Sequence, residues 1–308
     1  MNAPGQSMQP MAPRHEPVMT AELIGLLAPE HGGVFLDCTV GLGGHSRALL
    51  EAGATRIIAL DRDPDAIAAT RESFAASRWR DRIDLLHADY RDVEAVLDSL
   101  GVSKVDGALA DLGISSMQLE ASGRGFSFMR DEPLDMRMDP SGGPTAADLL
   151  ARASESELAN VIFEHGEERH SRRIARLIVT SRQDAPVRTT GQLAAIVRRA
   201  VPRRGYTRID PATRTFQALR IWVNRELEGL DLFLQALTRR LRAGARVVVI
   251  TFHSLEDRIV KHTFRTLEHA TEATVRVLTR KPVVPTASEI ARNPRARSAK
   301  LRAAERLA

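Results

Sequence analysis

A glycine-rich turn near the start of the chain has the residue types of a ligand-binding site. It runs from Asp37 through Gly41, Gly43 and Gly44 to His45, between an apolar run and a helical pattern. Glycines permit a tight turn and a close approach of the backbone to a ligand, and the first N–H groups of a helix are free to bind an anion. The turn therefore predicts a ligand site, with a role in packing alone as the simpler alternative.

The composition of the turn indicates which ligand it binds. The dinucleotide fingerprint G-x-G-x-x-G is incomplete, because a serine stands in the place of the third glycine. S-adenosylmethionine offers an ammonium group to Asp37 and a carboxylate to the N–H groups of residues 43–45. Asp61 ends the next apolar run, where it can hold ribose hydroxyls, and Asp89-Tyr90 follow the third run. We therefore expect S-adenosylmethionine as the cofactor.

Asp111 is the candidate for the catalytic residue. It ends a fourth apolar run, at the position that faces the transferred methyl group in methyltransferases of this fold. The amino group of cytosine or adenine is a poor nucleophile because its lone pair is delocalised into the ring, and a carboxylate can orient it or take its proton. Both roles are open for Asp111, and a cap at the strand–loop junction is the alternative. Gln118 is placed to bind either the cofactor or the base.

Aromatic and histidine residues after the strands are further candidates. Phe126 and Phe128 lie in the loop that follows Asp111, where they either stack on a flipped base or anchor the loop to the core. His253 follows a fifth apolar run and is expected to act as an acid/base group or an RNA contact. A helix cap formed by Ser254 with Asp257 is the plainer interpretation of that stretch.

Several other kinds of site are not expected. His165 and His170 are too widely spaced for the H-E-x-x-H zinc motif, so no metal is predicted. The single cysteine, Cys38, excludes a disulfide framework and a multi-cysteine zinc site. No apolar run approaches the ~18 residues of a membrane span, and residues 1–14 have the composition of a flexible tail rather than a signal peptide. We expect a cytoplasmic protein.

Short apolar runs alternate with helical patterns over the first third of the chain and must position these candidates. They predict strands at residues 34–36, 56–60, 83–86 and 105–110, and helices at 46–52, 64–76 and 93–100. An earlier helix, capped by Thr20, is expected to end at Leu27. This alternation forms βαβ units and a parallel sheet covered on both faces, with the ligand site at the carboxyl ends of the strands.

The rest of the chain has a different pattern. Residues 113–144 predict a long, functional loop. Three helical patterns follow, the first capped by Ser154 with Glu157, and we expect residues 141–210 to form an inserted helical domain. One helix is predicted over 212–241, a strand at 247–250, and a closing strand pair at 275–284 and 300–306. The sheet domain would then comprise residues 15–140 and 211–308.

Charge is segregated along the chain, although the formal net charge is only +5. Residues 169–225 contain 14 arginines and two acids, and residues 280–308 contain eight cations and two acids. Such segregation indicates a polyanionic partner, with a solvated helix face as the alternative. The residues expected to contact RNA here are Arg198, Arg199, Arg203 and Arg204.

The motifs together resemble those of the bacterial 16S rRNA cytosine-N4 methyltransferases, the RsmH (MraW) family. The matching stretches span nearly the whole chain, at residues 15–18, 41–46, 59–64, 111–116, 124–139, 211–224, 252–261 and 293–298. The resemblance implies an α/β fold, with a Rossmann-like class I methyltransferase sheet and an inserted all-helical domain. It also implies S-adenosylmethionine-dependent methylation of N4 of a cytidine in the decoding region of 16S rRNA, at position 1402 of that RNA.

The resemblance carries the family's contacts and partner over to this chain. The cofactor contacts fall on Gly43, Gly44, His45, Asp61, Tyr90, Asp111 and Gln118. The implied partner is 16S rRNA within the small ribosomal subunit, and the oligomeric state, a homodimer included, is left open. Many DNA amino-methyltransferases have Pro-Pro-aromatic after the catalytic position. Here Leu112-Gly113-Ile114 follow Asp111, so the usual base-stacking ring is missing.

Two other functions compete with RNA methylation. A methyltransferase acting on a protein or small molecule would not need the long cationic segments. A non-catalytic nucleic-acid-binding regulator on the same fold would not need the glycine turn, Asp61 and Asp111. Cys38 lies in the turn rather than beside Asp111, so we expect a direct, SN2-like transfer without a covalent enzyme intermediate.

Overall fold

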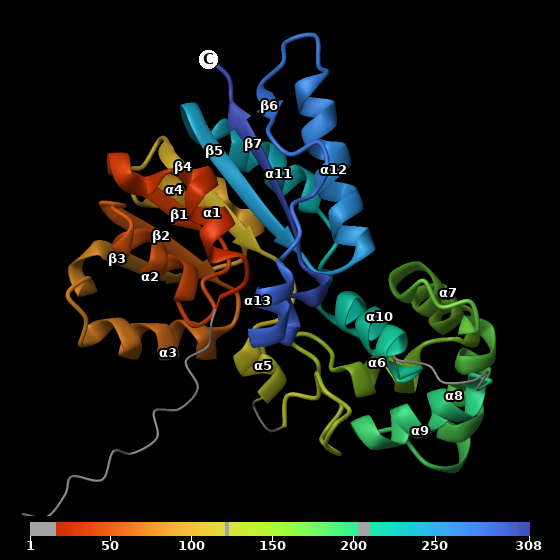
Figure 1. Ribbon diagram of the computed structural model, residues 1–308. Helices are drawn as coiled ribbons and strands as arrows, with labels where there is room; N and C mark the ends of the chain where they lie inside the picture. Colours follow the sequence, from red (N-terminus) through yellow and green to blue (C-terminus); the bar gives the residue numbers. More distant parts are fainter. Residues whose placement is uncertain (1–16, 121–122, 203–209) are drawn as a thin grey trace, which may run out of the picture.

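The computed structural model describes residues 17–120, 123–202 and 210–308, and in these residues a seven-stranded sheet carries the fold (Figure 1). Its strand order is β3-β2-β1-β4-β5-β7-β6. The strands are β1 (Val34–Asp37), β2 (Arg56–Asp61), β3 (Ile83–His87), β4 (Val105–Asp111), β5 (Leu241–Thr251), β6 (Val275–Val277) and β7 (Lys300–Arg306). Strands β1 to β5 run parallel, and β7 is antiparallel to both β5 and β6. The predicted strands are confirmed, although β6 covers only the start of its predicted segment.

Helices cover both faces of this sheet, because successive side chains of a buried strand point to opposite sides. On β2, Ile57 packs with one apolar cluster and Ile58 with the other. One face is covered by α1 (Thr20–Leu27), α2 (Gly44–Glu51) and α3 (Pro64–Ala75), and the other by α4 (Val93–Ser99), α11 (Leu230–Arg239) and α12 (Ser254–Glu268). The parallel, doubly covered sheet confirms the predicted α/β class.

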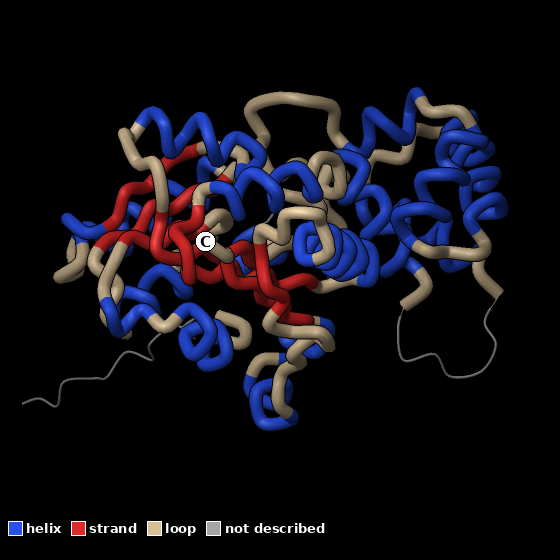
Figure 2. Tube along the Cα trace, turned by 90° about the horizontal axis from the view of Figure 1, so that it is seen from above, coloured by secondary structure: helices blue, strands red, loops and turns tan. Residues whose placement is uncertain are grey.

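A second, helical unit lies beside the sheet (Figure 2). Its helices are α6 (Ala146–Arg152), α7 (Glu155–Gly166), α8 (Ser171–Asp184), α9 (Thr190–Ala200) and α10 (Ala212–Asn224). Half of the predicted capping box is present: the Ser154 hydroxyl accepts a hydrogen bond from the Glu157 N–H at 3.1 Å, but the described structure shows no return bond to the Glu157 side chain. Leu158, Ile174 and Leu193 are fully buried between these helices. We call this apolar cluster the helical core.

The helical core takes in residues from both sides of the expected insert. Leu134 and Met136 precede residue 141, and Ala212 and Phe216 follow residue 210, yet all four are buried in it. The limits 141–210 therefore stay a prediction. The tail at residues 1–14 lies outside the described residues. No helix in the described ranges is long and apolar enough to cross a membrane.

Three local predictions were wrong. The single helix expected over 212–241 is two helices, α10 and α11, because Arg225 and Gly229 adopt left-handed conformations with φ of 51° and 68°. The loop 113–144 contains a short helix, α5 (Ser116–Glu120). Thr20 does not cap α1: left-handed Met19 holds the N-cap position, and the Thr20 hydroxyl donates to the Pro17 carbonyl.

Short elements complete the described chain. They are α13 (Ala287–Arg292) and the 3-10 helices η1 (Pro29–His31), η2 (Arg80–Arg82), η3 (Tyr90–Asp92) and η4 (Pro294–Ser298). The side chain of Glu289 in α13 accepts a 2.6 Å hydrogen bond from the Met19 N–H. This contact ties the end of the chain to its beginning, close to the carboxyl ends of the parallel strands (Figure 1).

Candidate active site

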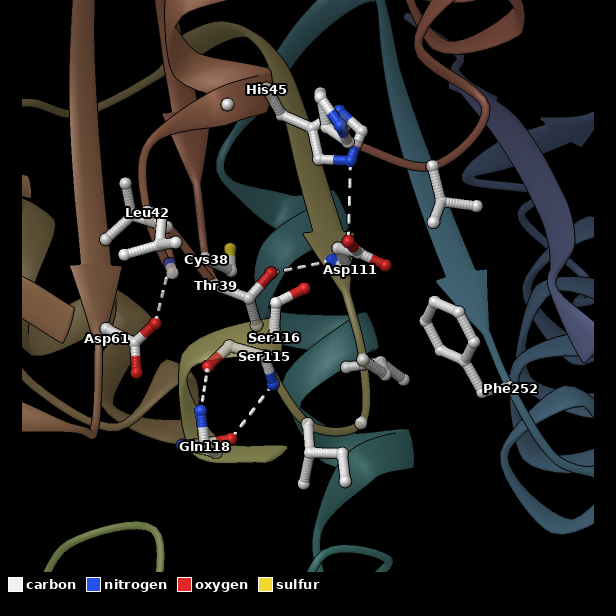
Figure 3. A pocket seen from close by; sticks show the side chains of 18 of the residues that line it. Cys38, Thr39, Leu42, His45, Asp61, Asp111, Ser115, Ser116, Gln118 and Phe252 are labelled. Atoms are coloured by element: carbon white, nitrogen blue, oxygen red, sulfur yellow. Dashed lines mark hydrogen bonds and ion pairs between the residues drawn. The ribbon is translucent and has the colours of Figure 1, made fainter. Parts of the chain in front are cut away.

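A cavity opens at the carboxyl ends of the parallel strands, where the sequence predicts the ligand site (Figure 3). Its empty space is about 1190 Å³, including solvent at its mouth, which is ample for a ligand the size of a nucleoside derivative. The predicted site residues that line it are Gly41, Gly44, His45, Asp61, Tyr90, Asp111 and Gln118. The structure therefore brings together residues from four separate strand ends and the loops behind them.

The glycine turn has a backbone that only glycine adopts easily. Gly41 and Gly43 have φ of 51° and 76°, in the left-handed region that other residues rarely adopt. A Cβ on Gly43 would lie 2.7 Å from Cε2 of Phe74, so Gly43 also permits the close packing of α2 against α3. Gly43 is the N-cap of α2, and no described side chain caps that helix. The first N–H groups of α2 are thus available to a ligand.

Asp61 is held in place by the turn. Its Oδ2 accepts a hydrogen bond from the Gly41 N–H at 2.8 Å, and its Oδ1 accepts one from the Asp63 N–H at 2.9 Å. Burial raises the pKa of Asp61 to about 6, although the two N–H groups oppose the shift. Each carboxylate oxygen can accept a second hydrogen bond, so both remain able to bind a hydroxyl group of a ligand.

Asp37 does not reach the cavity, contrary to the contact expected with a ligand's ammonium group. The residue is fully buried, and its carboxylate accepts hydrogen bonds from the Ser46 hydroxyl at 2.7 Å and the Thr39 N–H at 3.1 Å. Burial raises the pKa of Asp37, whereas the hydrogen bond from Ser46 lowers it. Asp37 therefore fastens the turn to the start of α2.

Asp111 and His45 lie side by side at the cavity with polar atoms that lack hydrogen-bond partners (Figure 3). His45 Nε2 lies 3.4 Å from Asp111 Oδ2. Among the described residues, Asp111 Oδ1 and both ring nitrogens of His45 are buried without a hydrogen-bond partner. The Asp111 N–H donates to the Thr39 hydroxyl at 2.6 Å, which fixes the backbone. Buried polar atoms without partners are rare in native proteins, so these atoms indicate a ligand.

Neighbouring carboxylates raise the pKa of His45. Burial alone lowers the pKa of the imidazole, but the carboxylates of Asp111 and Asp37 outweigh it and raise the pKa above its ordinary value. A protonated His45 is a cation whose Nε2 lies 3.4 Å from Asp111 Oδ2, so it can orient the Asp111 side chain. His45 is therefore suited to keep a carboxylate ready at the end of β4.

Tyr90 and Gln118 both line the cavity. The Tyr90 ring packs 4.5 Å from the Phe233 ring, and its hydroxyl donates to the Glu226 carbonyl at 3.1 Å. Gln118 Nε2 donates to Asp63 at 2.8 Å, and its Oε1 accepts from the Ser115 N–H at 2.9 Å. Tyr90 thus offers an aromatic surface, whereas both ends of the Gln118 amide already have partners within the protein.

Phe126 and Phe128 lie away from the cavity. Phe126 is buried in the helical core, and the Phe128 ring packs edge-on against Phe216 with centroids 4.9 Å apart. Of the two roles considered for these rings, the structure shows the anchoring of the loop. The sequence left both roles open, because an aromatic ring in a loop after a strand can either stack on a base or anchor the loop.

His253 also lies outside the cavity lining, and the cap expected from Ser254 with Asp257 was wrong. His253 is itself the N-cap of α12: its Nδ1 accepts from the Glu256 N–H, and Glu256 accepts from the His253 N–H, both at 3.4 Å. The Ser254 hydroxyl donates instead to Glu167 at 2.6 Å, and Asp257 accepts from Arg302 at 2.6 Å.

Phe252, Glu226 and Glu256 are among the lining residues that the sequence reasoning did not propose for the site. Phe252 directly follows the end of β5, so the rule that located Asp61 and Asp111 could have found it. Glu256 belongs to the first turn of α12. Glu226 sits at the break between α10 and α11, which the continuous apolar pattern concealed.

Oxygen and nitrogen atoms of Glu226, His253 and Glu256 lie within 4.8 Å of one another, a spacing that could hold a metal ion. The guanidinium of Arg220 already donates to both carboxylate oxygens of Glu226, at 2.9 and 2.8 Å. Because this cation occupies the same carboxylate, the cluster is stabilised within the protein as an ion-pair network.

The arginines expected to contact RNA lie in the helical unit, as far as the structure describes them. Arg198, on α9, pairs with Asp210 at 2.9 Å, and its guanidinium lies 5.8 Å from the centre of the Phe128 ring. Arg199 donates to the Ser181 hydroxyl at 3.1 Å. Arg203 and Arg204 lie outside the described residues.

The cavity fits S-adenosylmethionine on three counts. Asp61 has lone pairs for ribose hydroxyls, and Tyr90 offers a ring against which adenine can pack. The uncapped N-terminus of α2 offers N–H groups to a carboxylate. Asp111 lies beyond these features with an unpartnered oxygen, where a methyl acceptor would be needed.

Comparisons with known proteins agree with this interpretation. Residues 12–307 match the model of the MraW methylase family. The chain is 52% identical over 304 residues to the ribosomal RNA small subunit methyltransferase H of Bradyrhizobium diazoefficiens, covering 95% of this chain and 91% of the relative. It is 49% identical over 298 residues to the protein of that name from Kosmotoga olearia, covering 95% and 97%. The chain therefore belongs to the MraW methylase family of S-adenosylmethionine-dependent methyltransferases, which confirms the resemblance drawn from its motifs.

Proposed function

We propose that this enzyme transfers a methyl group to N4 of a cytidine in 16S rRNA, in the decoding region of the small ribosomal subunit. Two relatives that are about half identical to the chain are named as methyltransferases of small-subunit rRNA. The observation that carries the proposal is Asp111 Oδ1, a buried carboxylate oxygen without a partner in the described chain, at the cavity end of β4. An exocyclic amine would supply the missing hydrogen bond.

The cofactor supplies an electrophilic methyl group on a sulfonium centre. Asp61 would hold its ribose, Tyr90 would contact its adenine, and the N-terminal N–H groups of α2 would bind its carboxylate. These three groups belong to β2, to the loop after β3 and to the turn after β1. Because they rest on rigid elements, the reactive centre is fixed relative to Asp111.

Asp111 would then activate the acceptor. Its Oδ1 accepts a hydrogen bond from the N4 amino group, which orients the nitrogen lone pair for in-line attack. As the N–C bond forms and the C–S bond breaks, the nitrogen becomes more acidic and Asp111 takes its proton. His45, whose Nε2 lies 3.4 Å from Oδ2, holds the Asp111 side chain in position during the transfer.

A covalent enzyme intermediate is disfavoured by the state of the one cysteine at the cavity. Burial and the Asp37 carboxylate raise the pKa of the Cys38 thiol well above its ordinary value. The thiol therefore stays protonated at neutral pH, and only a thiolate is an effective nucleophile. Direct transfer to the amine requires no such group.

The helical unit supplies the cationic surface for the RNA. Arg172 and Arg173 on α8 and Arg199 on α9 are exposed, so their charges can face phosphates. Phosphate contacts of this kind give affinity that falls as salt rises. The proposal places the enzyme in the cytoplasm, where bacterial ribosomal subunits are found.

The test is to map the methylated nucleotide by mass spectrometry after incubating the enzyme and S-adenosylmethionine with unmethylated small subunits. We expect one N4-methylcytidine in 16S rRNA. Asp111→Ala should slow the reaction by roughly 10²–10⁴-fold, the usual contribution of a positioned acid or base. Asp98→Ala is the matched control, because Asp98 is exposed and pairs with Arg240 outside the cavity. A methyl group on another atom, or near-normal rates in Asp111→Ala, would refute the proposal.

A further inference from the structure

The acceptor base needs a surface to stack on, and the candidates from the sequence are engaged elsewhere. Leu112-Gly113-Ile114 stand where many DNA amino-methyltransferases have an aromatic residue, and Phe126 and Phe128 pack with the helical core. Bases taken out of a helix are usually held by stacking against flat side chains. The platform must therefore come from another element.

Within the described chain, the cavity lining includes one tyrosine and one phenylalanine, Tyr90 and Phe252. They come from opposite sides of the site. In the strand order β3-β2-β1-β4-β5, Tyr90 follows β3 and lies on the same side as Asp61, at the end of β2. Phe252 follows β5, the strand next to β4 and its Asp111. Tyr90 is thus placed for the cofactor, and Phe252 for the acceptor.

The register puts Phe252 beside the reacting amine. Asp111 pairs with Ile250 across the β4–β5 ladder, and the Leu112 N–H donates to the Ile250 carbonyl at 2.9 Å. Phe252 stands two residues beyond Ile250, and its ring lines the same cavity as Asp111 (Figure 3). A base stacked on this ring would carry its amino group toward the carboxylate.

Contacts with α12 and the sheet hold the Phe252 ring in position. The Phe252 N–H donates to Glu256 Oε2 at 2.9 Å, which ties the residue to the first turn of α12. One part of the side chain packs on the apolar cluster of the sheet, and the rest remains partly exposed at the cavity. A Cβ on Gly113 would come within 3.3 Å of the ring at Cδ2, so glycine at that position allows the backbone to pack closely against the ring.

We propose that Phe252 is the stacking platform for the acceptor nucleobase, replacing the aromatic residue missing after Asp111. This inference rests on the proposed function, because it assumes that a nucleobase is the acceptor. Any base has a flat face that can stack on Phe252, so the platform supplies affinity and orientation. The choice of an amino-bearing base falls to Asp111 Oδ1.

The test compares Phe252→Leu with Phe252→Tyr in the full-length enzyme acting on unmethylated small subunits. Loss of one base–aromatic stack should lower kcat/KM for the subunit by about tenfold to a hundredfold. Phe252→Tyr keeps the ring and should stay near the wild-type value. The dissociation constant for S-adenosylmethionine, measured by calorimetry, should be unchanged in both variants, since Phe252 is on the acceptor side.

Phe264→Leu is the control for a lost ring that does not face the cavity. Phe264 is on α12 but buried in the sheet core, so this variant should unfold more easily and keep its kcat/KM. Equal kcat/KM in Phe252→Leu and wild type would overturn the platform, and so would an equal loss in Phe252→Tyr. If the wild type methylates a different nucleotide, the proposed function fails but the comparison still tests the platform. If it methylates no RNA, both fail.

Discussion

Replacing Asp61 by asparagine should separate the stability of this enzyme from its cofactor binding. Asp61 is ionised at neutral pH but largely buried, and its pKa is raised from the ordinary value of 3.8 to about 6. An acid whose pKa is raised by folding contributes stability below its unfolded pKa, and that contribution is lost as pH rises through the folded pKa. The relevant window for Asp61 therefore runs from about 3.8 to about 6.

The size of this stability change follows from the size of the pKa shift of Asp61. A shift of about two units corresponds to at most about 3 kcal/mol of unfolding free energy, and the side chain's partial exposure reduces it. Asparagine removes the cost of burying a charge. Its N–H₂ group, however, would face one of the two backbone N–H groups that donate hydrogen bonds to Asp61, and the lost hydrogen bond costs about 1–3 kcal/mol. At pH 7 the variant should thus be about as stable as the wild type. Relative to the wild type it should lose stability as pH falls below 6.

Cofactor affinity of the wild type should fall as the pH is lowered, whereas its stability should rise. If only the ionised carboxylate binds the ribose hydroxyls, a pKa of about 6 leaves roughly a tenth of the protein competent at pH 5, so affinity should fall about tenfold from its neutral value. Asp61→Asn should bind at least about tenfold more weakly at pH 8, because it loses charge-assisted hydrogen bonds. The variant should also lack the part of the pH dependence that Asp61 causes.

The assay is calorimetry with S-adenosylmethionine between pH 5 and pH 8, alongside urea denaturation of both proteins over the same range. His45 is present in both, so its titration cancels in the comparison. The reasoning is refuted if Asp61→Asn binds as tightly as the wild type at pH 8. It is equally refuted if the wild-type and variant affinities change in parallel with pH.

Two further predictions concern the turn and the RNA surface. Gly43→Ala should lower the unfolding free energy by about 2–4 kcal/mol in urea denaturation, through left-handed strain and overpacking. Its control, Gly101→Ala, has φ of 67° and nothing within 4 Å of the new Cβ, so only the strain of about 1–2 kcal/mol should remain; equal losses would contradict the packing argument. Replacing Arg198 and Arg199 together by serine should reduce the slope of log K against log salt for small-subunit binding by about 1–2. An unchanged slope in filter-binding titrations would remove α9 from the RNA surface. The control replaces two exposed arginines outside the helical unit, Arg71→Ser on α3 and Arg78→Ser in the turn that follows it.

Much of the sheet could be predicted because its local signals agree. Each of the first four strands is a short apolar run bounded by turn residues, and β1, β2 and β4 end at Asp37, Asp61 and Asp111. Parallel strands bring such ends to one edge of a sheet, so the location of the cavity followed from the order of the chain. The N-cap at Ser154 shows the same agreement between local signal and structure.

The predictions that failed depend on conformations or contacts that the pattern does not encode. Arg225 ends α10 in a left-handed conformation that arginine seldom adopts, and apolar spacing continues on both sides of it. Phe126 and Phe128 have the same sequence context whether they face RNA or the helical core; only the packing with α10 decides. Tertiary contacts of this kind cannot be read from one segment alone.

The three aspartates at the strand ends show how the structure assigns different roles to the same signal. Asp37 is satisfied by Ser46 and Thr39 and serves the turn. Asp61 accepts hydrogen bonds from two backbone N–H groups and keeps further lone pairs for a ligand. In the described chain, Asp111 alone of the three retains a buried oxygen without a partner. Since burying such an atom costs free energy that a bound amine could recover, the unsatisfied oxygen, rather than the residue type, is the reason that we propose Asp111 as the catalytic residue.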